Sequence, residues 1–453
     1  MRSANTSDVV ICGAGITGVA AAYYLSKRGV RDILLIDERP PLTLTSAYST
    51  ECYRNWWPDA AMLQLMNRSI DLMESLADES GNSFGLNRRG YLYLTADDSN
   101  ADDLRNRARR IAQLDAGELR IHSHASAGYR PAALEGYTDQ PEGADLLLDP
   151  DLILRFFPGV TPEVKAGLHV RRAGWLSAQQ LGMYLLARAA EGGTRVLSAR
   201  VAGLKVRENR PIEVELDDGQ RISAGAFVNA AGPFIQDVAG MAGLDLPVRT
   251  ELHLKATIAD SRRVVDRGAP LLIWADPQVL PWESSARESL SADPSTRWMA
   301  LPFPSGVHTR PEGGAHGNAI LMLWEYHPEE MKPTLPPPTD PAFPEIAIRG
   351  LSRMLPRMQE YFGNLPRPVI DGGYYTRTPE NRPIIGPTSV EGMYVLGAVS
   401  GFGIMSACAA GELLASHLTA GTLPEYEAVF RLSRYDDPGY LPRAMAALEN
   451  GQL

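Results

Sequence analysis

Cysteine is scarce in this sequence, and its cysteines do not form a recognisable pair. The 453 residues include only Cys12, Cys52 and Cys408, which stand far apart without Cys-x-x-Cys or Cys/His spacing. A disulfide framework or a zinc site would need such spacing, so neither is expected. The histidine spacings match no known metal-binding pattern. We therefore expect no bound metal and a reducing compartment, the cytoplasm.

Long basic runs and long apolar runs are also missing. The formal net charge is −10 and no Lys/Arg run offsets it, which argues against general nucleic-acid binding. The first apolar run, VVICGAG from Val9, passes directly into glycines and is too short for a secretory or membrane-spanning segment. Nucleic acid and membrane are therefore not expected partners.

The remaining composition is that of an ordinary globular protein. Hydrophobic residues make up 44% and charged residues 22% of the chain, which is long enough for two folding units. No repeat of about 20–50 residues is visible, so a solenoid or propeller is not expected.

A dinucleotide-binding pattern lies near the N-terminus. DVVIC predicts a strand, and Gly13, Gly15 and Gly18 follow it in GxGxxG spacing, before a helical apolar pattern and a second apolar run that ends at Asp37. The three glycines would allow a tight turn, close approach of a pyrophosphate, and close packing of helix on strand. Asp37 is placed to accept hydrogen bonds from a ribose. The alternative is a glycine-rich turn without a ligand.

The next part of the chain has the pattern of an arm outside the nucleotide-binding core. Apolar spacing predicts a helix over 62–76, RRGYLYLTA from Arg88 predicts a strand, and a charged helix is expected over 102–114. Residues 117–143 have no regular pattern. A helix over 179–190 and a hairpin at Asp218-Gly219 then return to the core.

A change of composition marks a second folding unit. Residues 247–344 carry strands rich in Trp and His and end in the proline cluster TLPPPTDPAFP. A helix and a βα pattern follow from Ile346. We predict an α/β fold with a discontinuous Rossmann-like domain of residues 1–87, 148–246 and 346–453. The second domain, 88–147 and 247–345, is expected to be α+β on a mostly antiparallel sheet.

Five sequence motifs together resemble one enzyme superfamily. They are DVVICGAGITG with LLID, GWLSAQQLGMYLLARAAEGG, VNAAGPF, YYTRTPENRPIIGP, and SGFGIMSACAAGELLA preceded by MYVLGAVS. Their order and spacing are similar to those of the FAD-dependent D-amino-acid oxidase superfamily, in the branch of sarcosine and glycine oxidases. The resemblance implies an FAD-binding domain of the glutathione-reductase type.

The resemblance also implies which residues hold the FAD. The pyrophosphate would lie at Gly13, Gly15 and Gly18, the adenosine ribose at Asp37, and the flavin ring along Gly401, Gly403 and Ile404. The other cofactor residues implied are Ile16, Thr17, Glu38, Arg39, Ser46, Thr50, Val201, Ala230, Gly232, Phe402 and Met405. Helix N-termini at both places would favour negative charge.

In such enzymes a hydride passes from a carbon that bears an amine to the flavin, and water hydrolyses the resulting imine. The resemblance implies a secondary amine or N-methyl amino acid as substrate, with oxygen or another molecule as electron acceptor. A bulky or aromatic substrate would suit the Trp-rich strands. Two alternatives are oxidation of a 2-hydroxy acid and a flavin-binding subunit that needs a partner chain.

The sequence departs from its relatives where those bind flavin covalently or anchor the substrate. Gly373 takes the place of the flavin-linking cysteine of monomeric sarcosine oxidases, and no histidine occurs in residues 45–55. We therefore predict non-covalent FAD. Met405 takes the place of a lysine that binds the substrate carboxylate in those enzymes, so one anchor is missing.

Four residues are candidates for catalysis. Arg54, in TSAYSTECYRNWWPD, is expected to face the flavin or the substrate anion, and Tyr375 to border the substrate. His253 and Lys255 alternate onto one face of a strand, where a lysine near the flavin would favour oxygen reduction. The alternatives are an Arg54 held in a structural ion pair, with the tryptophans in the core, and a solvated Lys255 at a sheet edge.

Overall fold

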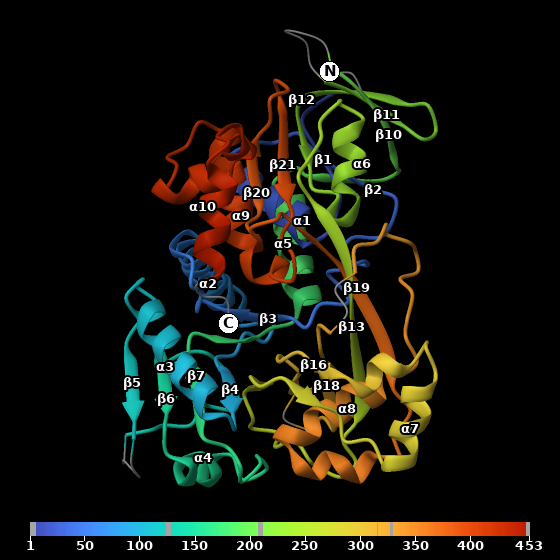
Figure 1. The fold of residues 1–453 in the computed structure, drawn as a ribbon. Helices are drawn as coiled ribbons and strands as arrows, with labels where there is room; N and C mark the ends of the chain where they lie inside the picture. Colours follow the sequence, from blue (N-terminus) through green and yellow to red (C-terminus); the bar gives the residue numbers. More distant parts are fainter. Residues whose placement is uncertain (1–5, 124–127, 207–211, 315, 327–328, 450–453) are drawn as a thin grey trace.

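The computed structural model describes residues 6–123, 128–206, 212–314, 316–326 and 329–449. Two sheets form the centres of two units, which lie one above the other in Figure 1. Within the described ranges, no helix combines the length and apolar character needed to cross a membrane.

The first sheet has eight strands and a parallel centre. Its strands are β1 (Thr6–Cys12), β2 (Ile33–Asp37), β9 (Arg195–Ser198), β10 (Val201–Lys205), β11 (Ile212–Leu216), β12 (Arg221–Asn229), β20 (Ile384–Pro387) and β21 (Met393–Gly397). The neighbours β21, β12, β1, β2 and β9 are parallel, whereas β10 and β11 extend β12 as an antiparallel meander. The apolar runs of β1 and β2 fit this position because helices cover both faces of a parallel sheet.

Helices cover this sheet and complete its core. They are α1 (Ile16–Lys27), α2 (Ala60–Ser80), α5 (Ala178–Glu191), α6 (Ile235–Gly240), α9 (Gly403–Leu418) and, at the C-terminal end, α10 (Tyr440–Glu449). Helix α1 packs against α5 and α9, and α2 packs against α9. Eleven of the residues of α1, Ile16 to Ser26, are buried, so this helix lies inside the unit rather than on its surface.

The second sheet has nine strands and is mostly antiparallel. In sheet order they are β19 (Val369–Arg377), β13 (Arg249–Ala259), β18 (Ala319–Leu323), β17 (His308–Glu312), β14 (Leu271–Trp274), β4 (Tyr91–Thr95), β7 (Ala166–Val170), β6 (Ala144–Leu147) and β5 (Leu119–His122). Only the pairs β14/β4 and β5/β6 are parallel among the pairings described. Helix α8 (Phe343–Met354) packs on β13 and β18, and α3 (Asp98–Ala112) and α4 (Pro150–Phe156) pack on the other end.

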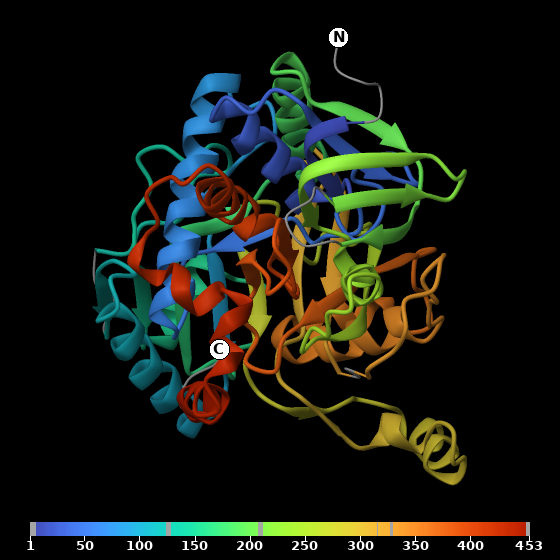
Figure 2. The same ribbon diagram turned by 90° about the horizontal axis from the view of Figure 1, so that it is seen from above.

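Shorter elements join or extend these units. They are β3 (Cys52–Arg54) paired with β8 (Ala173–Trp175), β15 (Gln278–Val279) paired with β16 (Pro302–Phe303), helix α7 (Ser284–Ala292), and the 3-10 helices Gly232–Phe234, Arg297–Ala300, Pro356–Tyr361, Glu425–Phe430 and Leu432–Asp436. Figure 2 shows the segment around α7, in yellow, reaching away from the rest of the molecule.

The strand pairing departs from the predicted domain boundaries in two places. Strand β7 pairs with β4 and β6, although residues 148–246 were expected in the nucleotide-binding domain. Strand β19 pairs along β13, and α8 packs on the same sheet, although both were expected in that domain. The reason is that an amphipathic helix or an alternating strand carries no local signal for which sheet it joins.

Some elements also differ from the sequence predictions. Residues 119–122 form β5 where no regular structure was expected, and α7 forms in a region read as strands only. In the same region residues 297–300 make a 3-10 helix, and only Pro302–Phe303 after them form a short strand. These are short or exposed segments, in which periodicity is a weak guide.

Candidate cofactor and substrate site

The turn from β1 into α1 has the shape that its glycines predict. Gly13 has φ +108, and an added Cβ would lie 2.3 Å from the carbonyl oxygen of Ala230. At Gly18 an added Cβ would lie 1.9 Å from the carbonyl oxygen of Gly13. Both positions therefore require glycine for folding, and Gly18 serves the packing of helix on turn.

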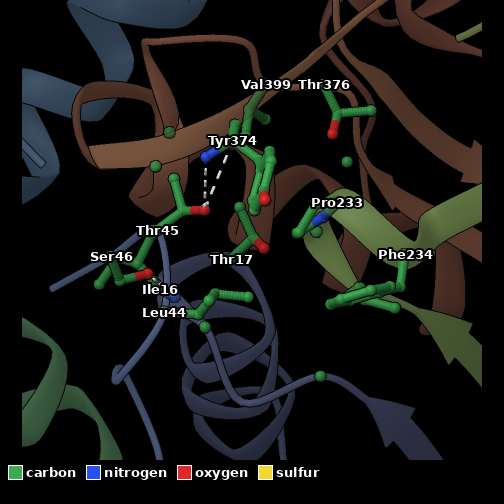
Figure 3. Close-up of a pocket in the computed structure, with 18 of the residues that line it drawn as sticks. Ile16, Thr17, Leu44, Thr45, Ser46, Pro233, Phe234, Tyr374, Thr376 and Val399 are labelled. Carbon is green, nitrogen blue, oxygen red and sulfur yellow. Dashed lines mark hydrogen bonds between the residues drawn. The ribbon is translucent and has the colours of Figure 1, made fainter. Parts of the chain in front are cut away.

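Gly15 differs because its free side faces a cavity. It caps α1 without a side-chain hydrogen bond, and an added Cβ would meet only Ser46 Oγ, at 3.5 Å. The backbone N–H of Ile16 donates to Ser46 Oγ at 3.0 Å, as Figure 3 shows. A helix N-terminus with open space before it is suited to phosphate.

A fixed carboxylate lies at the end of β2. Asp37 accepts hydrogen bonds from the backbone N–H groups of Ala14, at 2.8 Å, and Arg39, at 2.9 Å. Glu38 pairs with Arg39 at 2.7 Å and with Arg200 at 3.9 Å. The oxygens of Asp37 keep free lone pairs, so they can accept hydrogen bonds from a ribose.

The cavity of about 370 Å³ extends from this carboxylate to the second sheet. Most predicted site residues line it: Gly13, Gly15, Ile16, Thr17, Asp37, Glu38, Arg39, Ser46, Val201, Ala230, Gly232, His253, Lys255, Tyr375, Gly401, Gly403 and Ile404. Cys12 also lines it, and burial, with the charges of Asp37 and Glu38, raises the pKa of its thiol to about 12. This thiol is therefore neutral at physiological pH.

Four predicted cofactor residues do not line the cavity. Gly18 lies behind the turn, and Thr50 uses its carbonyl oxygen to accept from Arg310 Nη2 at 2.9 Å. Phe402 turns away and packs edge-on against Trp57, with 5.4 Å between ring centroids. Met405 is buried in α9. Their sequence neighbours line the cavity, but the geometry of the helix or turn places these four residues on the side away from it.

Arg54 does not line the cavity either. Its Nη1 donates to the hydroxyl of Tyr93 at 2.8 Å, and its guanidinium lies 4.8 Å from the ring centroid of Trp57. No ion pair of Arg54 is found among the described residues. Its predicted contact with the flavin or a substrate anion stays a prediction, and the packing on Trp57 matches the structural alternative in part.

Two neighbouring strands carry a ladder of polar side chains, of which His253, Lys255 and Tyr375 line the cavity. Lys255 and Asp371 lie opposite each other on β13 and β19, as do Glu251 and Tyr375. The ring of His253 stacks on that of Tyr375, with 3.9 Å between centroids and 17° between planes. One ion pair, Lys255–Asp371, thus flanks this aromatic stack on one side, and charged groups around Glu251 flank it on the other.

The Glu251 end of the ladder is tightly connected. Glu251 Oε2 lies 3.1 Å from Arg377 Nη2 and 3.3 Å from His253 Nε2, and the other ring nitrogen of His253 lies 3.4 Å from Glu325. Burial alone would raise the pKa of Glu251, but the hydrogen bond from His253 and the charge of Arg377 hold it below its ordinary value. Both nitrogens of His253 therefore face carboxylates.

Tyr375 connects this ladder to the turn before α9. A Cβ added to Gly401 would lie 2.5 Å from Cε2 of Tyr375, so the ring needs the glycine opposite it. Burial raises the pKa of Tyr375, and the charge of Glu325 adds to this. The phenol therefore stays neutral and offers an aromatic wall with one hydroxyl.

Residues 8–417 match the family model described as FAD dependent oxidoreductase. The chain belongs to this family. Dimethylglycine dehydrogenase, mitochondrial, of Mus musculus is 25% identical to the oxidoreductase over 427 residues, which cover 92% of this chain and 43% of that protein. The chain thus spans less than half the length of this relative.

Solved structures with the same fold cover nearly the whole oxidoreductase. The L-proline dehydrogenase of P. horikoshii has a TM-score of 0.73 at 20% identity and covers 96% of this chain and 99% of its own. The glycine oxidase of Geobacillus kaustophilus has a TM-score of 0.72 at 17% identity, with 95% and 99% covered. These likenesses establish the FAD-binding fold with its second, sheet-based unit.

FAD is the cofactor of this family, and the residues of the cavity fit it. The open side of Gly15 and the first turn of α1 would hold the pyrophosphate, and Asp37 the ribose. The turn at Gly401 and Gly403, which opens α9 without a side-chain cap, would face the flavin. The sequence analysis did not identify loop 42–45, which also lines the cavity. In this loop, Thr45 Oγ1 accepts a hydrogen bond from the backbone N–H of Tyr374 (Figure 3).

Non-covalent attachment of the FAD remains a prediction with a simple test. Gly373 lies against Thr45, 3.1 Å from an added Cβ to its Cγ2, and offers no atom for a covalent bond. Acid precipitation of the purified oxidoreductase is expected to leave all of the flavin in the supernatant. Yellow colour retained in the washed pellet would contradict it.

Proposed function

We propose that the oxidoreductase oxidises the C–N bond of a secondary amine or N-methyl amino acid and releases an imine that water hydrolyses. The observation that carries the proposal is the similarity over 92% of the chain to a protein named for dimethylglycine. The two solved structures are named for L-proline and glycine. All three compounds carry an amine on the carbon next to a carboxylate.

The cavity offers what such a substrate needs. When bound, FAD would supply a hydride acceptor for the carbon attached to nitrogen. Tyr375, backed by the ring of His253, forms a flat wall beside Gly401 and orients the substrate against it. The uncapped N-terminus of α9 stabilises negative charge at the same place. Oxygen or another molecule would serve as the final electron acceptor.

Product analysis tests this proposal. Incubation with N-methylglycine and an artificial electron acceptor is expected to yield formaldehyde and glycine in equal amounts, one of each per two electrons transferred. The flavin-free Gly15→Val variant described below is the control for background chemistry. A 2-oxo acid formed from a 2-hydroxy acid, without any aldehyde from N-methyl amines, would contradict the proposal.

A further inference from the structure

Lys255 holds an unusual position in the cavity. It lies on β13, is 9% exposed and lines the cavity from the second sheet. Its Nζ donates to the carbonyl oxygen of Ser49 at 3.1 Å and lies 3.4 Å from Oδ1 of Asp371. An ammonium carries three N–H donors, so one donor is left for a group inside the cavity.

The partner of Lys255 is poorly satisfied. Oδ1 of Asp371 is buried, and its contact with Lys255 lacks hydrogen-bond geometry to any described residue. Burial raises the pKa of Asp371, and the charge of Lys255 offsets this only in part. The ion pair therefore lacks a well-formed hydrogen bond, and the ammonium of Lys255 can also interact with a second anion.

The other basic side chains that line the cavity are already engaged. Arg39 and Arg200 both pair with Glu38 beside the carboxylate of Asp37. The two nitrogens of His253 face Glu251 and Glu325. Among the described lining residues of the second sheet, Lys255 is thus the one with a cationic donor directed to the cavity.

We propose that Lys255 binds the carboxylate of the substrate and that Asp371 tunes this binding by competing for the same ammonium. The inference rests on the proposed function and narrows it to substrates that carry a carboxylate. When the substrate is bound, two carboxylates share one cation, and their mutual repulsion sets the affinity. Lys255 and Asp371 should therefore have opposite effects on substrate binding.

Binding of a carboxylate that cannot be oxidised tests this without turnover. The probe is propanoate, with propanamide as its uncharged match, and the readout is the change in visible absorption of the FAD-loaded protein. Lys255→Met is expected to lower the affinity for propanoate by at least about 30-fold, because the carboxylate loses its buried charge partner. Asp371→Asn is expected to tighten it by on the order of tenfold, because the competing charge is gone. The affinity for propanamide should be the same in both variants as in the unmodified protein.

Control variants separate this role from general damage. Lys205→Met, at a half-exposed lysine of β10 that does not line the cavity, should bind propanoate like the unmodified protein. If Lys255→Met does not retain FAD, the propanoate affinity of Asp371→Asn is the deciding measurement. Unchanged or weaker propanoate binding by Asp371→Asn would overturn the inference.

Other outcomes distinguish the anchors and the two proposals. If Arg54→Met abolishes propanoate binding while Lys255→Met does not, Arg54 is the anchor and the inference is wrong. If the opposite effects at Lys255 and Asp371 are found but no amine yields an aldehyde, the anion site stands and the amine chemistry falls. If an amine yields an aldehyde but Lys255→Met binds propanoate as well as the unmodified protein does, the amine chemistry stands and this inference is wrong.

Discussion

The Gly15→Val variant is expected to fold and to contain no FAD. A Cβ at this position meets only Ser46 Oγ, at 3.5 Å, so the backbone has no reason to move. The valine methyl groups would instead fill the space before α1, where the pyrophosphate must approach the backbone. Loss of two charge-assisted hydrogen bonds costs about 3 kcal/mol or more, which is over about 100-fold in affinity.

The ratio of flavin to protein absorbance and the melting temperature together test this prediction. Gly203→Val is a matched control, because Gly203 lies on β10 with its nearest neighbour 3.8 Å from an added Cβ and does not line the cavity. It should retain its flavin. Gly18→Val is expected to fail differently, by misfolding, because its Cβ would overlap the backbone of Gly13. A yellow, fully loaded Gly15→Val protein would contradict the account of the turn.

Glu380→Ala is expected to destabilise the protein by about 3–5 kcal/mol. Glu380 is fully buried and lies 2.8 Å from Nη2 of Arg434, which is itself buried. The hydroxyls of Tyr435 and Tyr440 donate to the same carboxylate, at 2.8 Å and 3.0 Å. Without Glu380, the guanidinium of Arg434 would stay buried without its charged partner, and the C-terminal segment would lose part of its attachment to the loop after β19.

Urea denaturation checks the size of this loss. Glu360→Ala is the matched control, because Glu360 pairs with Arg357 on the surface, at 2.8 Å, where solvent screens the charges. It should unfold at the same urea concentration as the unmodified protein. Equal midpoints for the two variants would show that the buried pair does not hold this segment.

The nucleotide-binding turn could be predicted from the sequence because its determinants are local. Gly13, Gly15 and Asp37 lie within one strand–helix–strand unit, and the structure brings them to one cavity. The strand alternation of His253 and Lys255 was equally local. Their partners Glu251 and Asp371 were not recognised, because the pairing of β13 with β19 joins segments far apart in sequence.

Pairing between charged residues was the least predictable feature. Arg377, Arg382 and Glu380 are neighbours in TRTPENRP, and their spacing alone would suggest that they pair with one another. In the structure Arg377 binds Glu251, Arg382 binds Asp59, and Glu380 binds Arg434. Each of the three charged side chains pairs with a residue of a distant element. The local spacing of the loop does not indicate which residue that is.

Anaerobic bleaching of the flavin absorbance tests the central claim most directly. The panel would contain N-methyl amino acids, cyclic imino acids, primary amino acids, amines without a carboxylate, and 2-hydroxy acids. The account predicts that secondary amines carrying a carboxylate bleach the flavin and that 2-hydroxy acids do not. Bleaching by 2-hydroxy acids alone would contradict amine oxidation as the function of this oxidoreductase.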